Sequence, residues 1–70
     1  MTRDEWLEAF AAELGLPIPS SEEIAPLLEI AALAAHASER TAAPLSCWLA
    51  GRSGLSLAEL RLAAERIASP

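Results

Sequence analysis

The chain of 70 residues contains no lysine, no valine and only one cysteine. Without lysine, its positive charge comes from five arginines, which face ten acidic residues and leave a net charge of −5 at pH 7. Nucleic acids are bound through clusters of positive charge, and no basic stripe occurs here, so we expect no nucleic-acid partner. The lone cysteine, Cys47, cannot form a disulfide within the chain, which fits a reducing cytosol.

Targeting signals and long apolar runs are also missing. The N-terminus, MTRDEWLEAF, is acidic and lacks the positive start and apolar stretch of a signal peptide. The longest stretch of low charge, 24–36, contains Pro26 and Glu29 and is too short to cross a bilayer. We therefore expect a cytoplasmic protein that does not associate with a membrane.

The scarcity of β-branched residues indicates an all-α fold. Four isoleucines and two threonines are the only ones, whereas alanine and leucine, the strongest helix formers, supply much of a composition that is 53% hydrophobic. Seventy residues allow a single domain, 1–70, and a chain of this size buries only about 60% of its unfolded surface. We therefore expect a partner or a second copy to cover apolar surface that the small core leaves exposed.

A capping box predicts the start of the first helix, over 3–14. Thr2 and Glu5 stand at the spacing in which each side chain bonds the backbone amide of the other residue. Gly15 is a typical helix end. The large apolar side chains between them recur every four residues, which is typical of one apolar helix face: Trp6, Phe10 and Leu14.

A second helix is predicted over about 22–39, and Pro26 leaves the position of its first residue undecided. A proline deep inside a helix costs about 3 kcal/mol. Either the helix begins at Ser21 with Pro26 in a kinked early turn, or Ser21 to Ala25 form a separate turn and the helix begins near Pro26. A helix body that starts at Pro26 is favoured.

Two further helices follow, and all four are short. The third is predicted over 43–51, with Thr41 or Ala43 as its cap, and the fourth over 57–68, after a second capping box, SLAE, that begins at Ser56. Short connections favour antiparallel neighbours. The expected fold is a compact bundle of four short helices, with the bulkiest side chains in its core: Trp6, Phe10 and Trp48.

The sequence offers little material for catalysis. One histidine and one cysteine, His36 and Cys47, fall short of a metal site, and a nucleophilic Cys–His pair would also need an orienting group and an oxyanion hole. Cysteine beside an apolar run usually packs as a small hydrophobe. We therefore expect no enzymatic activity, no metal and no cofactor.

Polar residues are concentrated in the connection between the second and the third predicted helix. If the helix reaches residue 39, His36 and Arg40 lie one turn apart and share a face. One interpretation is structural, because cations near a helix C-terminus stabilise its dipole. The other is a contact with an anion or a partner, aided by amides at the next helix N-terminus. The candidate contact residues are His36, Arg40, Thr41, Ser46 and Arg52.

Motifs over most of the chain resemble those of a small actinobacterial helical domain of unknown function. They lie in EWLEAFAAELGL and in LLEIAALAAHASERTAAPLSCWLAGRSG, with departures from the family pattern at Thr41 and Trp48, where proline and phenylalanine are common. Members of that family occur alone or C-terminal to a molybdenum-cofactor guanylyltransferase domain. The resemblance implies a link to molybdenum-cofactor maturation. It does not imply guanylyltransferase activity, because the chain has no nucleotide-binding domain.

Two functional hypotheses follow. The first is a small non-enzymatic interaction module that docks on a protein partner, an enzyme of molybdenum-cofactor maturation, and that self-associates as a homodimer. The second is a module that binds a phosphate or pterin-type anion at the corner between His36 and Ser46.

Overall fold

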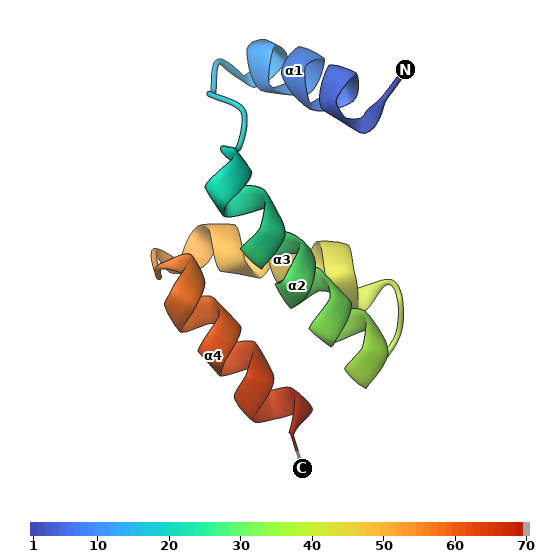
Figure 1. The fold of residues 1–70 in the computed structure, drawn as a ribbon, viewed down its shortest axis with the longest axis vertical. Coiled ribbons are helices and arrows are strands. Elements are labelled where there is room, and N and C mark those ends of the chain that lie inside the picture. The colour runs from blue at the N-terminus through green and yellow to red at the C-terminus, as the bar shows by residue number, and fades with distance from the viewer. Residues whose placement is uncertain (70) are drawn as a thin grey trace.

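The computed structural model describes residues 1–69, and these form four helices without a strand. The helices are α1 (Arg3–Leu14), α2 (Ser21–Ala37), α3 (Ala42–Ser53) and α4 (Leu57–Ala68). The all-α fold of four short helices is thus confirmed. Helices α2, α3 and α4 pack together, whereas α1 lies beyond the N-terminal end of α2 (Figure 1).

Capping boxes begin three of the four helices. In each, the hydroxyl oxygen of the cap accepts from the backbone N–H three residues later, and a glutamate accepts from the backbone N–H of the cap. The pairs are Thr2–Glu5, Ser20–Glu23 and Ser56–Glu59. Because each box joins residues only three apart, it forms wherever the helix begins and needs no tertiary contact.

Helix α2 runs without a break from Ser21 to Ala37, so the favoured helix body that starts at Pro26 is wrong, and the helix begins at Ser21, as in the other interpretation. Pro26 lies inside it and removes only one backbone donor, which would otherwise bond the carbonyl of Glu22. The helix ends two residues earlier than predicted. There the Ser38 hydroxyl donates to the Ala34 carbonyl at 2.7 Å and the chain turns toward α3.

Helix α3 is longer than the predicted 43–51 at both ends. Thr41 is its N-cap, although the Thr41 side chain makes no capping hydrogen bond. Gly51 continues the helix instead of ending it, and Gly54 takes the left-handed conformation at the end, with φ of 73°. Because Gly51 lies within the helix and Gly54 just past it, only Gly54 needs the freedom of a residue without Cβ.

The core among the described residues is narrow. Its buried hydrophobic side chains are Ala11, Ile30 and Ala50. The expectation that the three bulkiest residues form the core is wrong, because Trp6, Phe10 and Trp48 are 56%, 50% and 62% exposed. Large rings need a facing helix to cover them, and α2 packs mainly against α3 and α4 while α1 lies at one end of it (Figure 1).

Acidification is expected to destabilise the protein through the first two capping boxes. The backbone N–H of Thr2 and then its hydroxyl lower the pKa of Glu5, and the corresponding groups of Ser20 lower the pKa of Glu23. A carboxyl with a lowered pKa in the folded state contributes stability above its ordinary pKa of 4.5, and this contribution is lost as the pH falls through the lowered value.

Thermal unfolding measured from pH 7 to pH 3 checks this dependence. Replacing Glu5 and Glu23 together with glutamine, which keeps an acceptor but cannot titrate, should flatten the fall in melting temperature at acid pH. Glu22→Gln, also in the first turn of α2 but outside the capping box, is the control and should leave the slope nearly unchanged. An equal flattening by the control would refute the role of the boxes.

Candidate functional site

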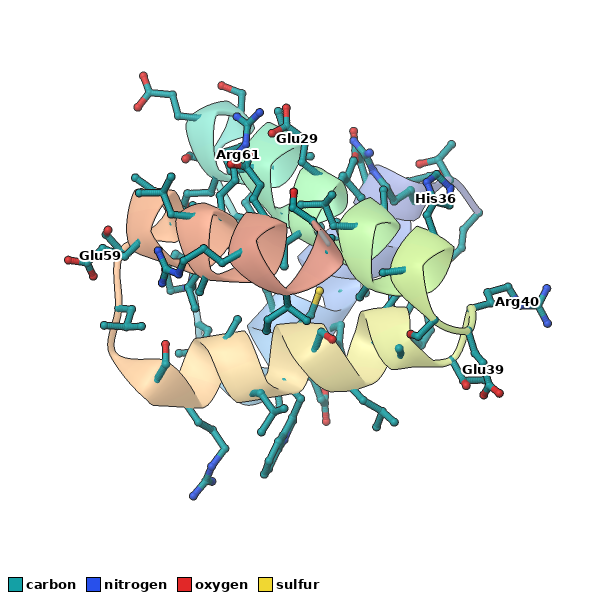
Figure 2. The ribbon with its side chains drawn as sticks, turned by 90° about the horizontal axis from the view of Figure 1, so that it is seen from below. Glu29, His36, Glu39, Arg40, Glu59 and Arg61 are labelled. Atoms are coloured by element: carbon teal, nitrogen blue, oxygen red, sulfur yellow. The ribbon has the colours of Figure 1, made fainter. Side chains whose placement is uncertain are left out.

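The structure spreads the five candidate contact residues over three parts of the surface. His36 lies near the C-terminal end of α2, on a shallow hollow that Glu29, Arg61 and Glu65 also line. Because α2 ends at Ala37, Arg40 does not follow His36 on the same helix face, and its side chain points away from the body (Figure 2). The expected one-turn pairing of His36 with Arg40 is therefore not formed.

Arg40 and Thr41 occupy the short connection between α2 and α3. Both are exposed, and the Arg40 guanidinium makes no hydrogen bond or ion pair with any of residues 1–69. The connection is flanked by Ser38 and Ala42, which line an adjoining groove. Arg40 is thus a solvated positive charge at the edge of an apolar depression.

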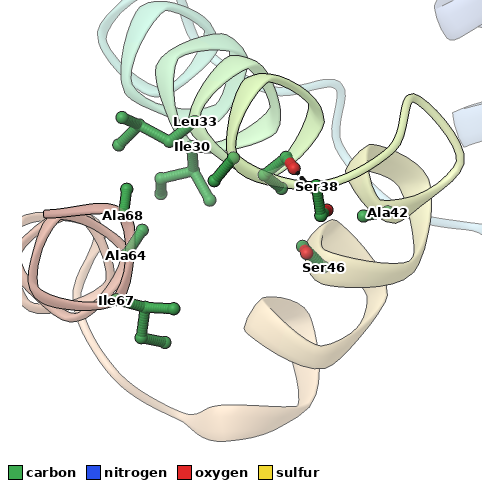
Figure 3. Close-up of a pocket in the computed structure, with 10 residues that line it drawn as sticks. Ile30, Leu33, Ser38, Ala42, Ser46, Ala64, Ile67 and Ala68 are labelled. Atoms are coloured by element: carbon green, nitrogen blue, oxygen red, sulfur yellow. Dashed lines mark hydrogen bonds between the residues drawn. The ribbon is translucent and has the colours of Figure 1, made fainter. Parts of the chain in front are cut away.

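That groove, which we call the α2–α4 groove, is open to solvent and has a volume of about 280 Å³ (Figure 3). Its lining comes from α2, α4 and the start of α3, and half of the lining residues are alanines, with larger apolar side chains at Ile30, Leu33 and Ile67. Ile67 is 85% exposed. Ser46 lines the groove as well, and the other serine, Ser38, already donates its hydroxyl to the Ala34 carbonyl.

Arg52, the last candidate, lies at the far end of α3 from the corner. Its guanidinium carbon is 4.7 Å from the ring centroid of Trp48, a cation–π arrangement. Arg52 therefore belongs to the outer surface of α3 and not to the groove. Of the five candidates only Ser46 lines the groove, and Arg40 and Thr41 lie in the connection that precedes α3.

An ion-pair network that sequence reasoning missed joins α2 to α4. Arg61 bonds Glu29 on α2 at 2.8 Å and Glu65 on its own helix at 3.0 Å (Figure 2). The spacing of Arg61 and Glu65 could have indicated the second bond, because residues four apart on a helix are neighbours. The bond to Glu29 had no signal in the sequence, since it depends on how α4 lies on α2.

Cys47 and His36 do not share a site. Cys47 is half-buried and lines a different hollow, with Leu27 and Leu60, on the side of α3 that faces α2 and α4. No group of three histidine, cysteine or acidic side chains within residues 1–69 is arranged to hold a metal ion. Over the same residues, each helix is too short or too polar to cross a membrane.

Comparison with known proteins places the chain in a family. No curated protein and no solved structure matches it. A family described as a domain of unknown function, DUF6457, matches residues 1–69. Because this match spans nearly the whole chain, the helices, the groove and the corner described above all lie within it, and the chain belongs to the DUF6457 family.

Proposed function

We propose that this protein is a small non-enzymatic interaction module that docks on an enzyme of molybdenum-cofactor maturation through the α2–α4 groove. The observation that carries the proposal is the groove itself, an open apolar depression of about 280 Å³ on a chain with a narrow core. Exposed apolar depressions with polar edges are typical of protein interaction sites.

Charge at the edge of the groove indicates what the partner presents. Within residues 1–69 the Arg40 guanidinium has no ion-pair partner, and Arg40 lies two residues from both Ser38 and Ala42, which line the groove. Arginine is enriched at the energetic centres of interfaces. A partner segment with an apolar side chain for the groove and a carboxylate for Arg40 would satisfy both. Ile67, which is 85% exposed, would become covered in such a complex.

The class of partner comes from the resemblance in the sequence. Domains with these motifs accompany molybdenum-cofactor guanylyltransferases, and this resemblance is the reason for proposing such an enzyme as the partner. The proposal thus assigns recognition to this chain and the chemistry to its partner.

Titration calorimetry with the purified molybdenum-cofactor guanylyltransferase of the same genome tests the proposal. Arg40→Ala and Ile67→Ala should each weaken binding about 10-fold, because each removes more than about 1 kcal/mol of contact. Leu62→Ala is a matched control, since Leu62 lies on the same helix, is 55% exposed and lines a hollow other than the groove. Binding by Leu62→Ala should stay within 2-fold of the parent protein.

Two results would contradict the proposal. One is the absence of binding by the parent protein at a concentration of 100 µM, roughly the weak end of specific transient contacts. The other is a loss of affinity in Leu62→Ala equal to that in Ile67→Ala, which would remove the groove as the docking surface.

A further inference from the structure

The outer side of α3 carries an apolar stripe that no other segment of residues 1–69 covers. Leu45, Trp48 and Leu49 are 66%, 62% and 63% exposed, and with Arg52 they follow the spacing of one helix face. We call these four residues the α3 face. In Figure 2 the side chains on this side of α3 extend away from α2 and α4, opposite the side on which those helices pack.

Helix α1 carries a second uncovered stripe, the α1 face, made of Trp6, Phe10 and Leu14. The rings of Trp6 and Phe10 stack with centroids 5.8 Å apart, and all three side chains are at least half exposed. The side of α1 next to this face is already used, because Leu7 is half-buried and lines a hollow with Ile24 at the start of α2.

The exposed area is larger than a single folded chain of this mass requires. The accessible surface is 5552 Å², whereas a compact monomer of 7.4 kDa exposes about 4,200 Å². The excess of about 1,300 Å² is more than the roughly 800 Å² that one partner contributes to a protein interface of standard size. A second copy that covers both faces would bring the exposed area into the usual range.

The charges of the two helices indicate how the copies pair. The residues of α1 carry four carboxylates and one arginine, a net charge of −3, whereas α3 contains no acidic residue and has Arg52. Pairing α1 with α1 would bring like charges together, and like charges in a contact disfavour it. Pairing α1 with α3 instead sets an acidic helix against the only helix of the four without a carboxylate.

We infer that the chain forms a twofold symmetric dimer in which the α1 face of each copy covers the α3 face of the other. The contact between α1 and α3 is made twice, once in each direction, so the assembly closes on itself and leaves neither stripe exposed. The segment 15–20, with Pro17 and Pro19, joins α1 to the start of α2, so that α1 lies at one end of the three packed helices (Figure 1). The α2–α4 groove is not part of this interface.

Complementation between two variants tests the reciprocal arrangement. The α1 variant carries Trp6→Ala and Phe10→Ala, and the α3 variant carries Leu45→Ala and Trp48→Ala. In sedimentation velocity at about 200 µM the parent protein should be dimeric and each variant alone monomeric. An equimolar mixture should regain dimer, because the α1 variant keeps an intact α3 face and the α3 variant keeps an intact α1 face.

The parent protein also offers a test without substitutions. Its two tryptophans, Trp6 and Trp48, lie one in each face, so dilution from 100 µM to 0.1 µM should shift their emission to longer wavelength as the dimer dissociates. A monomeric parent protein at 200 µM would overturn the inference. So would a mixture with no more dimer than either variant alone, because that result indicates pairing of like faces.

These outcomes are separate from the test of the proposed function. If the parent protein is monomeric and binds the enzyme, the inferred dimer is wrong and the proposed docking function is supported. If it is dimeric and does not bind the enzyme, the docking function is wrong and the dimer is supported. Leu62→Ala, outside both faces and outside the groove, should leave both readouts unchanged.

Discussion

Replacing Ile30 with alanine should lower the free energy of unfolding by about 2–5 kcal/mol, the cost of removing a buried isoleucine side chain and leaving a cavity. Ile30 is 4% exposed, and among residues 1–69 it is the only large side chain that is buried. It lies on α2, the helix that packs against both α3 and α4. A core of this size supplies only about 3–5 kcal/mol in total, so the variant should be largely unfolded at 37 °C.

Urea unfolding followed by far-UV circular dichroism measures this loss. Leu28→Ala is the matched control, since Leu28 is on the same helix, two residues away, and is 54% exposed. Its cost should be at most about 1 kcal/mol, because only part of its surface is buried. Ile30→Val should fall between them, at about 0.5–1.5 kcal/mol. All variants need the same protein concentration, because self-association raises apparent stability.

The result that would count against this account is a Leu28→Ala variant as unstable as Ile30→Ala. It would mean that the exposed side of α2 is covered in solution and that the core extends beyond the three packed helices.

Two glycines only three residues apart should respond to alanine with opposite signs. Gly54, the residue after α3, has φ of 73°, and an alanine there should cost about 1–2 kcal/mol because its Cβ crowds the following carbonyl. Gly51 is helical, and a Cβ added there meets nothing within 4 Å. Gly51→Ala should therefore stabilise the protein by about 0.5–1 kcal/mol, since alanine loses less backbone entropy in a helix.

Thermal unfolding of the two variants, compared with the parent protein, decides the matter. A rise in melting temperature for Gly51→Ala and a fall for Gly54→Ala are expected. Gly54→Asn separates backbone strain from packing, because asparagine tolerates the left-handed conformation and should lose less stability than alanine. A destabilising effect of equal size at both positions would contradict the open space found around Gly51.

The helices were predictable because the interactions that begin them are local. The boxes at Thr2 and Ser56 join residues three apart, so the sequence alone shows both partners, and the starts of α1 and α4 were predicted correctly. Ends were less predictable. Helix α2 stopped two residues early at the Ser38 bond to the Ala34 carbonyl, and α3 passed through Gly51. Several residues in those regions favour termination, and the spacing does not show which of them acts.

The candidate site was predictable only in part. The residues between Ser38 and Ser46 were marked by their polarity, and Arg40 does stand exposed there. The groove beside them could not be foreseen, because its walls come from α2, α3 and α4 together. Arg52 was grouped with the corner by its charge alone, and the structure places it at the opposite end of α3, over Trp48.

The sequence by itself determined that this is a chain of short helices, which residues cap two of them, and which side of each helix is apolar. These properties depend on neighbours within one or two turns. Only the tertiary structure decided which apolar sides are covered. A stripe such as Trp6 and Phe10 shows that a helix face is apolar but not whether another helix packs on it, because burial depends on where distant segments pack. Here α2 packs against α3 and α4, and the aromatic faces of α1 and α3 stay exposed in the single chain, open to solvent or to a second copy.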